Sequence, residues 1–261
     1  MFYHTIPRHA LAKRLQIASR GSRARFIEFT TEIGRSELAD RFSTPFHSIG
    51  ESISIWTKLL DDLTIEQGKT VWLEKTPPHI DFIPAIERYV PDARFIHLIR
   101  SGPDTIASMW DQAEKARQRS GTAWSLNDCI NRWVSAVQVS RNVQNRLHHL
   151  ILRYESVVGE TGAILTEICD FMGLKYEVEM LQRYPLVARN VVLPSEQDCK
   201  AGASQPIRNV NRQKFGKLFS EQEQRYILER IRAVELSKIT EGDSVLGRNL
   251  GASSNETILA D

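Results

Sequence analysis

The chain has 261 residues, which is enough for one sizeable α/β domain with its own hydrophobic core. Its 34 Lys and Arg residues nearly balance its 32 Asp and Glu residues, so no global positive field favours nucleic acid or a membrane surface as a partner. The three cysteines lack metal-ligand spacing and no apolar run is long enough to span a membrane, so we expect a cytoplasmic protein without a metal.

The N-terminal segment, residues 1–27, is basic and contains no acidic residue. This composition is typical of an organelle transit peptide, but Leu11, Leu15 and Ile17 also fit the apolar stripe of an ordinary basic helix. Residues 37–67 are predicted to form helices and loops around a tryptophan and three leucines.

A short strand is predicted at Val71-Trp-Leu73, and it ends in Glu74-Lys75. The Pro77-Pro78 pair ends the strand because proline removes backbone donors. A carboxylate and an ammonium are therefore expected at one edge of a sheet. Taken alone, they also fit an ordinary ion pair at the rim of a sheet.

The next elements are a crossover helix at Asp81–Tyr89 and a buried strand at Phe95–Ile99. Arg100 follows the strand, and a helix is predicted to begin after Ser101-Gly-Pro-Asp104. Ligands of open α/β sheets bind at the carboxyl ends of the strands, so Arg100 and Ser108 are candidate anion ligands. Their spacing alone also fits a surface arginine and an ordinary helical serine.

Three more elements follow along the chain. We expect a helix at Leu126–Leu147, a strand at His149–Arg153 with the polar end Tyr154-Glu155, and an amphipathic helix through Ile164–Met172. Gly173 is predicted to end that last helix.

These segments together resemble the sulfotransferases that use 3′-phosphoadenosine 5′-phosphosulfate (PAPS), particularly the bacterial and protein-tyrosine-type branches. The resemblance rests on Glu74-Lys-Thr-Pro77, a helix, Pro91-Asp-Ala-Arg-Phe-Ile-His-Leu-Ile-Arg100, and a serine eight residues after that arginine. In the family this arginine and serine grip the 3′-phosphate, which implies these roles for Arg100 and Ser108. The tyrosine of a Leu-x-Tyr-Glu strand lies near the adenosine, which makes Tyr154 a third candidate, although a structural, buried tyrosine also fits.

A basic segment at Pro206–Glu221 resembles the loop and helix cap near the family's carboxyl end. The resemblance implies phosphate contacts for Arg208, Arg212 and Lys214. Gln213 stands where an aromatic residue is usual, so the register stays open, and a solvated basic loop is the alternative for each of the three.

Sulfuryl transfer needs positioning, charge stabilisation and a base, and by this logic no metal. By resemblance to branches that use a carboxylate, Glu74 is the first candidate base. His79 is the alternative and ranks behind Glu74, because the family's catalytic histidine usually lies two residues after the lysine, and Pro77 stands at that position here. Lys75 is expected to neutralise charge on the transferring oxygens. His97 is predicted to be a buried core histidine.

The family also has a loop resembling a Walker A motif, which wraps the 5′-phosphosulfate at a helix N-terminus. Upstream of Glu74 no apolar strand leads into such a loop, and Ser19-Arg-Gly-Ser22 is flanked by basic residues. Arg119-Ser-Gly-Thr-Ala-Trp124 matches in letters, but it follows the Arg100 block and a polar helical segment. We interpret it as part of a loop on the acceptor side.

The expected fold is therefore α/β: a three-layer sandwich with a central parallel sheet, P-loop nucleotide-hydrolase-like, without its first strand-loop-helix unit. We expect one N-terminally incomplete domain at residues 1–241 and a disordered tail at 242–261.

The function implied by the resemblance is transfer of a sulfuryl group from PAPS to a hydroxyl or amine. The alternative is a catalytically silent relative that binds an adenosine 3′,5′-bisphosphate-type nucleotide or a protein partner. Small-molecule, carbohydrate, lipid and tyrosyl acceptors are all compatible with this fold.

Overall fold

The structure is a computed structural model that describes residues 2–7, 9–42, 47–121, 123–191, 205, 207 and 212–234. The chain divides into two compact units, of which the first comprises residues 1–93 and 184–205 and the second residues 94–183 and 206–261. The predicted tail at 242–261 lies outside the described residues.

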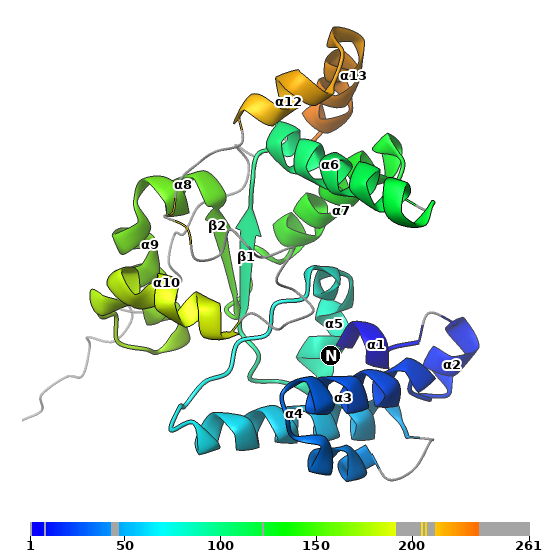
Figure 1. Ribbon diagram of the computed structural model, residues 1–261, viewed down its shortest axis with the longest axis vertical. Helices are drawn as coiled ribbons and strands as arrows, with labels where there is room; N and C mark the ends of the chain where they lie inside the picture. The colour runs from blue at the N-terminus through cyan, green and yellow to red at the C-terminus, as the bar shows by residue number, and fades with distance from the viewer. Residues whose placement is uncertain are drawn as a thin grey trace, which may run out of the picture. The chain divides into compact units, whose positions relative to one another are not determined.

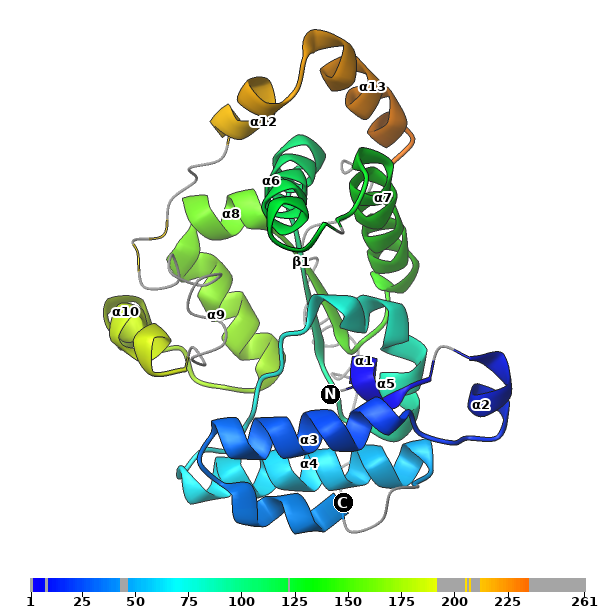
Figure 2. The same cartoon turned by 45° about the vertical axis from the view of Figure 1, so that its right-hand side comes forward.

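The described part of the first unit is helical (Figures 1 and 2). Its elements are α1 (Phe2–Thr5), α2 (Ala10–Arg14), α3 (Arg20–Glu32), η1 (Ser36–Phe42), α4 (Ile49–Glu66), η2 (Pro77–Phe82) and α5 (Ile83–Tyr89). Phe26, Phe42 and Leu59 are fully buried between them, and the Phe26 ring contacts those of Phe42 and Trp56. The helix predicted at Asp81–Tyr89 is confirmed as the end of η2 followed by α5, but it is no crossover between strands, because residues 70–76 form no strand.

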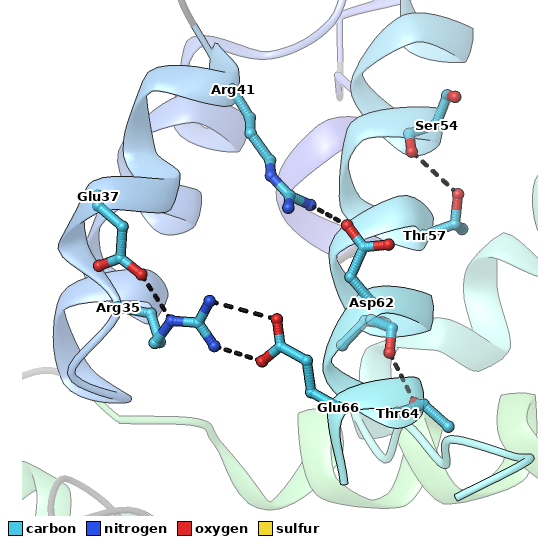
Figure 3. Close-up of polar contacts among 9 residues, drawn as sticks. Arg35, Glu37, Arg41, Ser54, Thr57, Asp62, Thr64 and Glu66 are labelled. Carbon is cyan, nitrogen blue, oxygen red and sulfur yellow. Dashed lines mark hydrogen bonds and ion pairs between the residues drawn. The ribbon is translucent and has the colours of Figure 1, made fainter. Parts of the chain in front are cut away.

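Ion pairs on the surface of the first unit connect η1 and its approach to α4 (Figure 3). The Arg35 guanidinium contacts Glu66 at 2.5 Å and Glu37 at 2.6 Å, and Arg41 contacts Asp62 at 2.8 Å. These side chains are partly exposed, so solvent screens the pairs and each contributes little to the stability of the fold.

The prediction of a buried strand at Val71–Leu73 is wrong. Residues 70–76 form no regular element, and the Val71 and Leu73 side chains are 40% and 76% exposed. A run of three apolar residues is too short to fix its own burial, and the extended segment instead leads into η2 at Pro77. Glu74 and Lys75 therefore lie on an irregular segment rather than at the end of a strand.

The second unit contains a parallel pair of strands, β1 (Phe95–Ile99) and β2 (His149–Arg153). Between them the chain forms α6 (Gly102–Ser120) and α7 (Leu126–Val143). After β2 come α8 (Tyr154–Gly159), α9 (Thr161–Met172), the start of α10 (Glu179–Val191), α12 (Arg212–Leu218) and α13 (Glu221–Arg232).

Helices lie on both faces of this sheet, with α6 and α7 on one side and α8 and α9 on the other (Figures 1 and 2). The core between the sheet, α6, α7 and α13 includes Ile99, Ile106, Ile130, Trp133, Ile151 and Ile227. This confirms the predicted layered α/β architecture with a parallel sheet, of which the described residues contain two strands. The helix predicted at Leu126–Leu147 is confirmed as α7, although it ends at Val143. The helix predicted through Ile164–Met172 is confirmed as α9, and Gly173 ends it in the left-handed conformation.

Candidate functional site

The register of the two parallel strands brings Arg100 to Tyr154. Ile99 at the end of β1 is level with Arg153 at the end of β2, so the next residue of each strand leaves the sheet at the same edge. The Cζ atom of Arg100 lies 4.5 Å from the centre of the Tyr154 ring, a cation–π contact that holds the guanidinium over the ring face. Two residues predicted to bind one nucleotide are thus in direct contact.

Ser108 lies on a polar face of α6. Residues spaced by three or four positions share a helix face, and Asp104, Ser108, Asp111 and Lys115 have this spacing. Ser108 is half-buried on this face.

Lys214 of α12 is attached to the same face of α6. Its ammonium donates to the Asp111 carboxylate at 2.8 Å, and Lys115 donates to the same oxygen at 3.1 Å. These contacts, led by that of Lys214, lower the pKa of Asp111 below its ordinary value. The structure therefore places the Lys214 ammonium beside Asp111, which is three residues after Ser108 on α6.

The other two basic candidates are not placed. Arg208 lies outside the described residues, and Arg212 is described only as the first residue of the α12 backbone.

Glu74 and His79 form a pair in the first unit. His79 Nδ1 lies 2.6 Å from a Glu74 carboxylate oxygen, and the Thr76 hydroxyl donates to the other oxygen at 2.5 Å. Burial alone would raise the pKa of Glu74, but the hydrogen bonds from His79 and Thr76 outweigh it and lower the pKa. The carboxyl is thus ionised at neutral pH, which makes it a better hydrogen-bond acceptor than proton acceptor.

The far side of the His79 ring is enclosed. The Phe2 ring packs edge-on at 5.4 Å between centroids, and His79 Nε2 is buried without a hydrogen-bond partner among the described residues. Lys75, by contrast, is exposed and pairs with no carboxylate of the described part of the chain.

The candidate residues therefore form two groups, one in each compact unit. Glu74, Lys75 and His79 belong to the first unit, and the Arg100 group belongs to the second.

A sequence model of the sulfotransferase family matches residues 4–178, about two thirds of the chain. The chain belongs to the sulfotransferase family. The structure is also similar to the sulfotransferase domain from the curacin biosynthetic pathway, with 16% sequence identity, 82% of this chain and 79% of that chain covered, and a TM-score of 0.49. None of the curated proteins compared with the chain matches it.

This sulfotransferase carries two segments that resemble a phosphosulfate loop in letters, and the structure separates them. Arg119-Ser-Gly121 is the C-terminal end of α6, with Gly121 in the left-handed conformation at φ 73°. A helix C-terminus presents carbonyl oxygens and the negative end of the helix dipole, so it repels a phosphosulfate. This segment is not the loop.

Ser19-Arg-Gly-Ser22, in contrast, begins the 13-residue helix α3. No apolar strand precedes it in the sequence, yet in the structure it lies at a helix N-terminus, the kind of position where anions bind. Its donors are already engaged: Gly21 N donates to Ser19 Oγ at 3.2 Å, and Ser22 N donates to the Ser19 carbonyl at 2.9 Å. The buried Ser22 hydroxyl bonds Thr5 at 2.8 Å.

The described residues contain no group of three His, Cys, Asp or Glu side chains that could hold a metal. None of the helices in the described ranges is long and apolar enough to cross a membrane.

Proposed function

We propose that this sulfotransferase uses PAPS as the donor and transfers its sulfuryl group to a hydroxyl or amine acceptor. The observation that carries the proposal is the Arg100–Tyr154 contact at the carboxyl ends of β1 and β2. It supplies a fork of guanidinium donors for a phosphate and an aromatic ring beside it for the nucleoside.

In this proposal the nucleotide is held by side chains of the second unit. Arg100 and Ser108 grip the 3′-phosphate and Tyr154 lies near the adenosine. Lys214 adds positive charge to the face of α6 that carries Ser108, and Asp111 fixes its position. Arg208 and Arg212 remain proposed phosphate contacts.

Glu74 and His79 act together as the acid–base group. The Glu74 carboxylate accepts the Nδ1 proton of His79 and so fixes the tautomer in which Nε2 carries the lone pair. Nε2 is buried beside the Phe2 ring, so this contact must open before Nε2 takes the proton of the acceptor hydroxyl. The acceptor oxygen bonds to sulfur while the bond from sulfur to the bridging phosphate oxygen breaks, which releases adenosine 3′,5′-bisphosphate. Lys75 offsets the charge on the transferring oxygens.

A second candidate function is favoured by the start of α3. The backbone and hydroxyl donors there are bonded within the unit, so a 5′-phosphosulfate would have to displace Ser19 from Gly21. A relative that binds adenosine 3′,5′-bisphosphate without transferring sulfate accounts for this arrangement.

Transfer of labelled sulfate from PAPS to a panel of small phenols, sugars, lipids and tyrosyl peptides separates the two functions. We expect transfer to at least one class, and a loss of about 10²–10⁴-fold in His79→Asn, the usual contribution of a general base. Glu74→Gln should lose less, because the ring keeps Nε2 but loses its charged partner. His9→Asn, an exposed histidine of the same unit, is the matched control. Nucleotide binding without transfer to any class would assign the chain to the second function.

A further inference from the structure

The Arg100 turn is held by contacts from two elements that lie apart in the sequence. Ser101 and Glu155 are each the second residue after a strand end, because Ile99 of β1 pairs with Arg153 of β2. The Ser101 backbone N–H donates to a Glu155 carboxylate oxygen at 2.9 Å. The polar end of β2 thus holds both the side chain of Arg100 and the amide that follows it.

The opposite side of the turn is held by α7. The Trp133 indole N–H donates to the Arg100 carbonyl at 3.1 Å, and the indole is almost fully buried. Its ring also packs against Gly102, where a Cβ atom would lie 3.1 Å from the indole. Both polar groups of the peptide bond that joins Arg100 to Ser101, the carbonyl and the N–H, are therefore fixed by hydrogen bonds to side chains.

Glu155 also limits which groups of the turn can bind a phosphate, because it occupies the Ser101 N–H. Its carboxylate occupies the N-terminal end of α6, where the helix dipole attracts an anion. Because this negative charge repels a ligand phosphate from the helix end, the phosphate must bind through the side chains of Arg100 and Ser108.

We infer that Trp133 and Glu155 are positioning residues for recognition of the 3′-phosphate: they fix the strand-to-helix turn from which Arg100 reaches the nucleotide. The inference rests on the proposed nucleotide site. A guanidinium on a mobile turn pays ordering entropy each time it binds, whereas a fixed turn does not.

The test compares the affinity for adenosine 3′,5′-bisphosphate with that for adenosine 5′-monophosphate, which lacks only the 3′-phosphate. We expect Glu155→Ala and Trp133→Phe each to reduce this affinity ratio by roughly threefold to tenfold, the range of one net hydrogen bond. Partial unfolding would weaken both ligands alike and leave the ratio unchanged.

Glu155→Gln distinguishes positioning from simple charge effects. The amide oxygen still accepts from Ser101, so the ratio should stay within about twofold of the parent or rise as a repulsive charge is removed. Trp56→Phe is the control for Trp133→Phe, because it removes another buried indole hydrogen bond, to Ser22, in the first unit. It should lower stability and leave the ratio intact.

The failures are separable. If the parent protein does not prefer the bisphosphate, or Arg100→Ala keeps the preference, the nucleotide site itself is wrong. If Arg100→Ala abolishes the preference while Glu155→Ala and Trp133→Phe keep it, only the positioning roles are overturned. A gain in the ratio in Glu155→Ala would likewise overturn the role of Glu155.

Discussion

At the scale of single residues, Gly102 shows how closely the Arg100 turn is packed. A Cβ atom there would lie 2.9 Å from Ile231 Cδ1 and 3.1 Å from the Trp133 ring. The isoleucine methyl can move, but the indole is held by its bond to the Arg100 carbonyl. We expect Gly102→Ala to lower the free energy of unfolding by about 1 kcal/mol, at the low end of overpacking effects.

Gly216 of α12 is the opposite case, because its surroundings are open, and urea denaturation of both alanine variants compares the two sites. A Cβ atom there would meet no heavy atom of the described residues within 4 Å. We expect Gly216→Ala to stabilise by about 0.4–1 kcal/mol, because alanine restricts the unfolded chain. Equal effects of the two substitutions would contradict the close packing described for Gly102.

The sequence can predict the position of residues that directly follow a strand. Arg100 and Tyr154 each follow a recognisable strand, and parallel strands end at the same edge, so their contact follows from the pattern. Trp133 and Glu155 could not be predicted as partners of the turn, because their contacts depend on the register of β2 and the position of α7. The pairing of Glu74 with His79 could not be predicted either, because the apolar residues at 71–73 indicate a strand, whereas the turn into η2 brings the two side chains together.

At the scale of elements, a buried histidine pair joins β1 to β2. His97 Nε2 lies 3.0 Å from His149 Nδ1, and His97 Nδ1 lies 2.9 Å from the Ser140 hydroxyl of α7. The Phe95 ring stacks on His149 at 4.4 Å. His97 is thus confirmed as a buried core histidine. Burial, followed by the neighbouring His149, lowers the pKa of His97 from 6.5 to about 4.

This pair predicts sensitivity to acid. Below pH 6.5 His97 binds a proton in the unfolded chain but stays neutral in the folded chain. The contribution of neutral His97 to stability is therefore fully present above pH 6.5 and is lost as the pH falls toward 4. Urea denaturation by circular dichroism should show a midpoint that decreases steadily from pH 7.5 to pH 4.5. His97→Gln should be less stable at pH 7.5 but less dependent on pH, whereas exposed His9→Gln should keep the parent slope. An unchanged slope in His97→Gln would refute this role.

The elements that the sequence predicted well are those with long periodic patterns. α7 and α9 each present an apolar face over at least three turns, and polar or glycine residues mark their ends. The three apolar residues at 71–73 lack such a pattern, and the sequence cannot tell whether so short a run is buried.

At the scale of the whole molecule, the family match at residues 4–178 covers parts of both compact units. The proposed acid–base group lies in the first unit and the proposed nucleotide group in the second. In the proposed function, binding and transfer depend on different sets of side chains, and each set can be substituted while the other activity is measured.

The central claim is that Arg100 binds the 3′-phosphate of the nucleotide, and calorimetric titration with adenosine 3′,5′-bisphosphate tests it most directly. Arg88→Ala is the matched control, because Arg88 also stacks on a tyrosine, Tyr89, but in the first unit. We predict that the parent and Arg88→Ala bind the nucleotide alike, and that Arg100→Ala binds about 10- to 100-fold more weakly, as expected for charge-assisted hydrogen bonds. No binding by the parent protein, or equal binding by Arg100→Ala, would contradict the account.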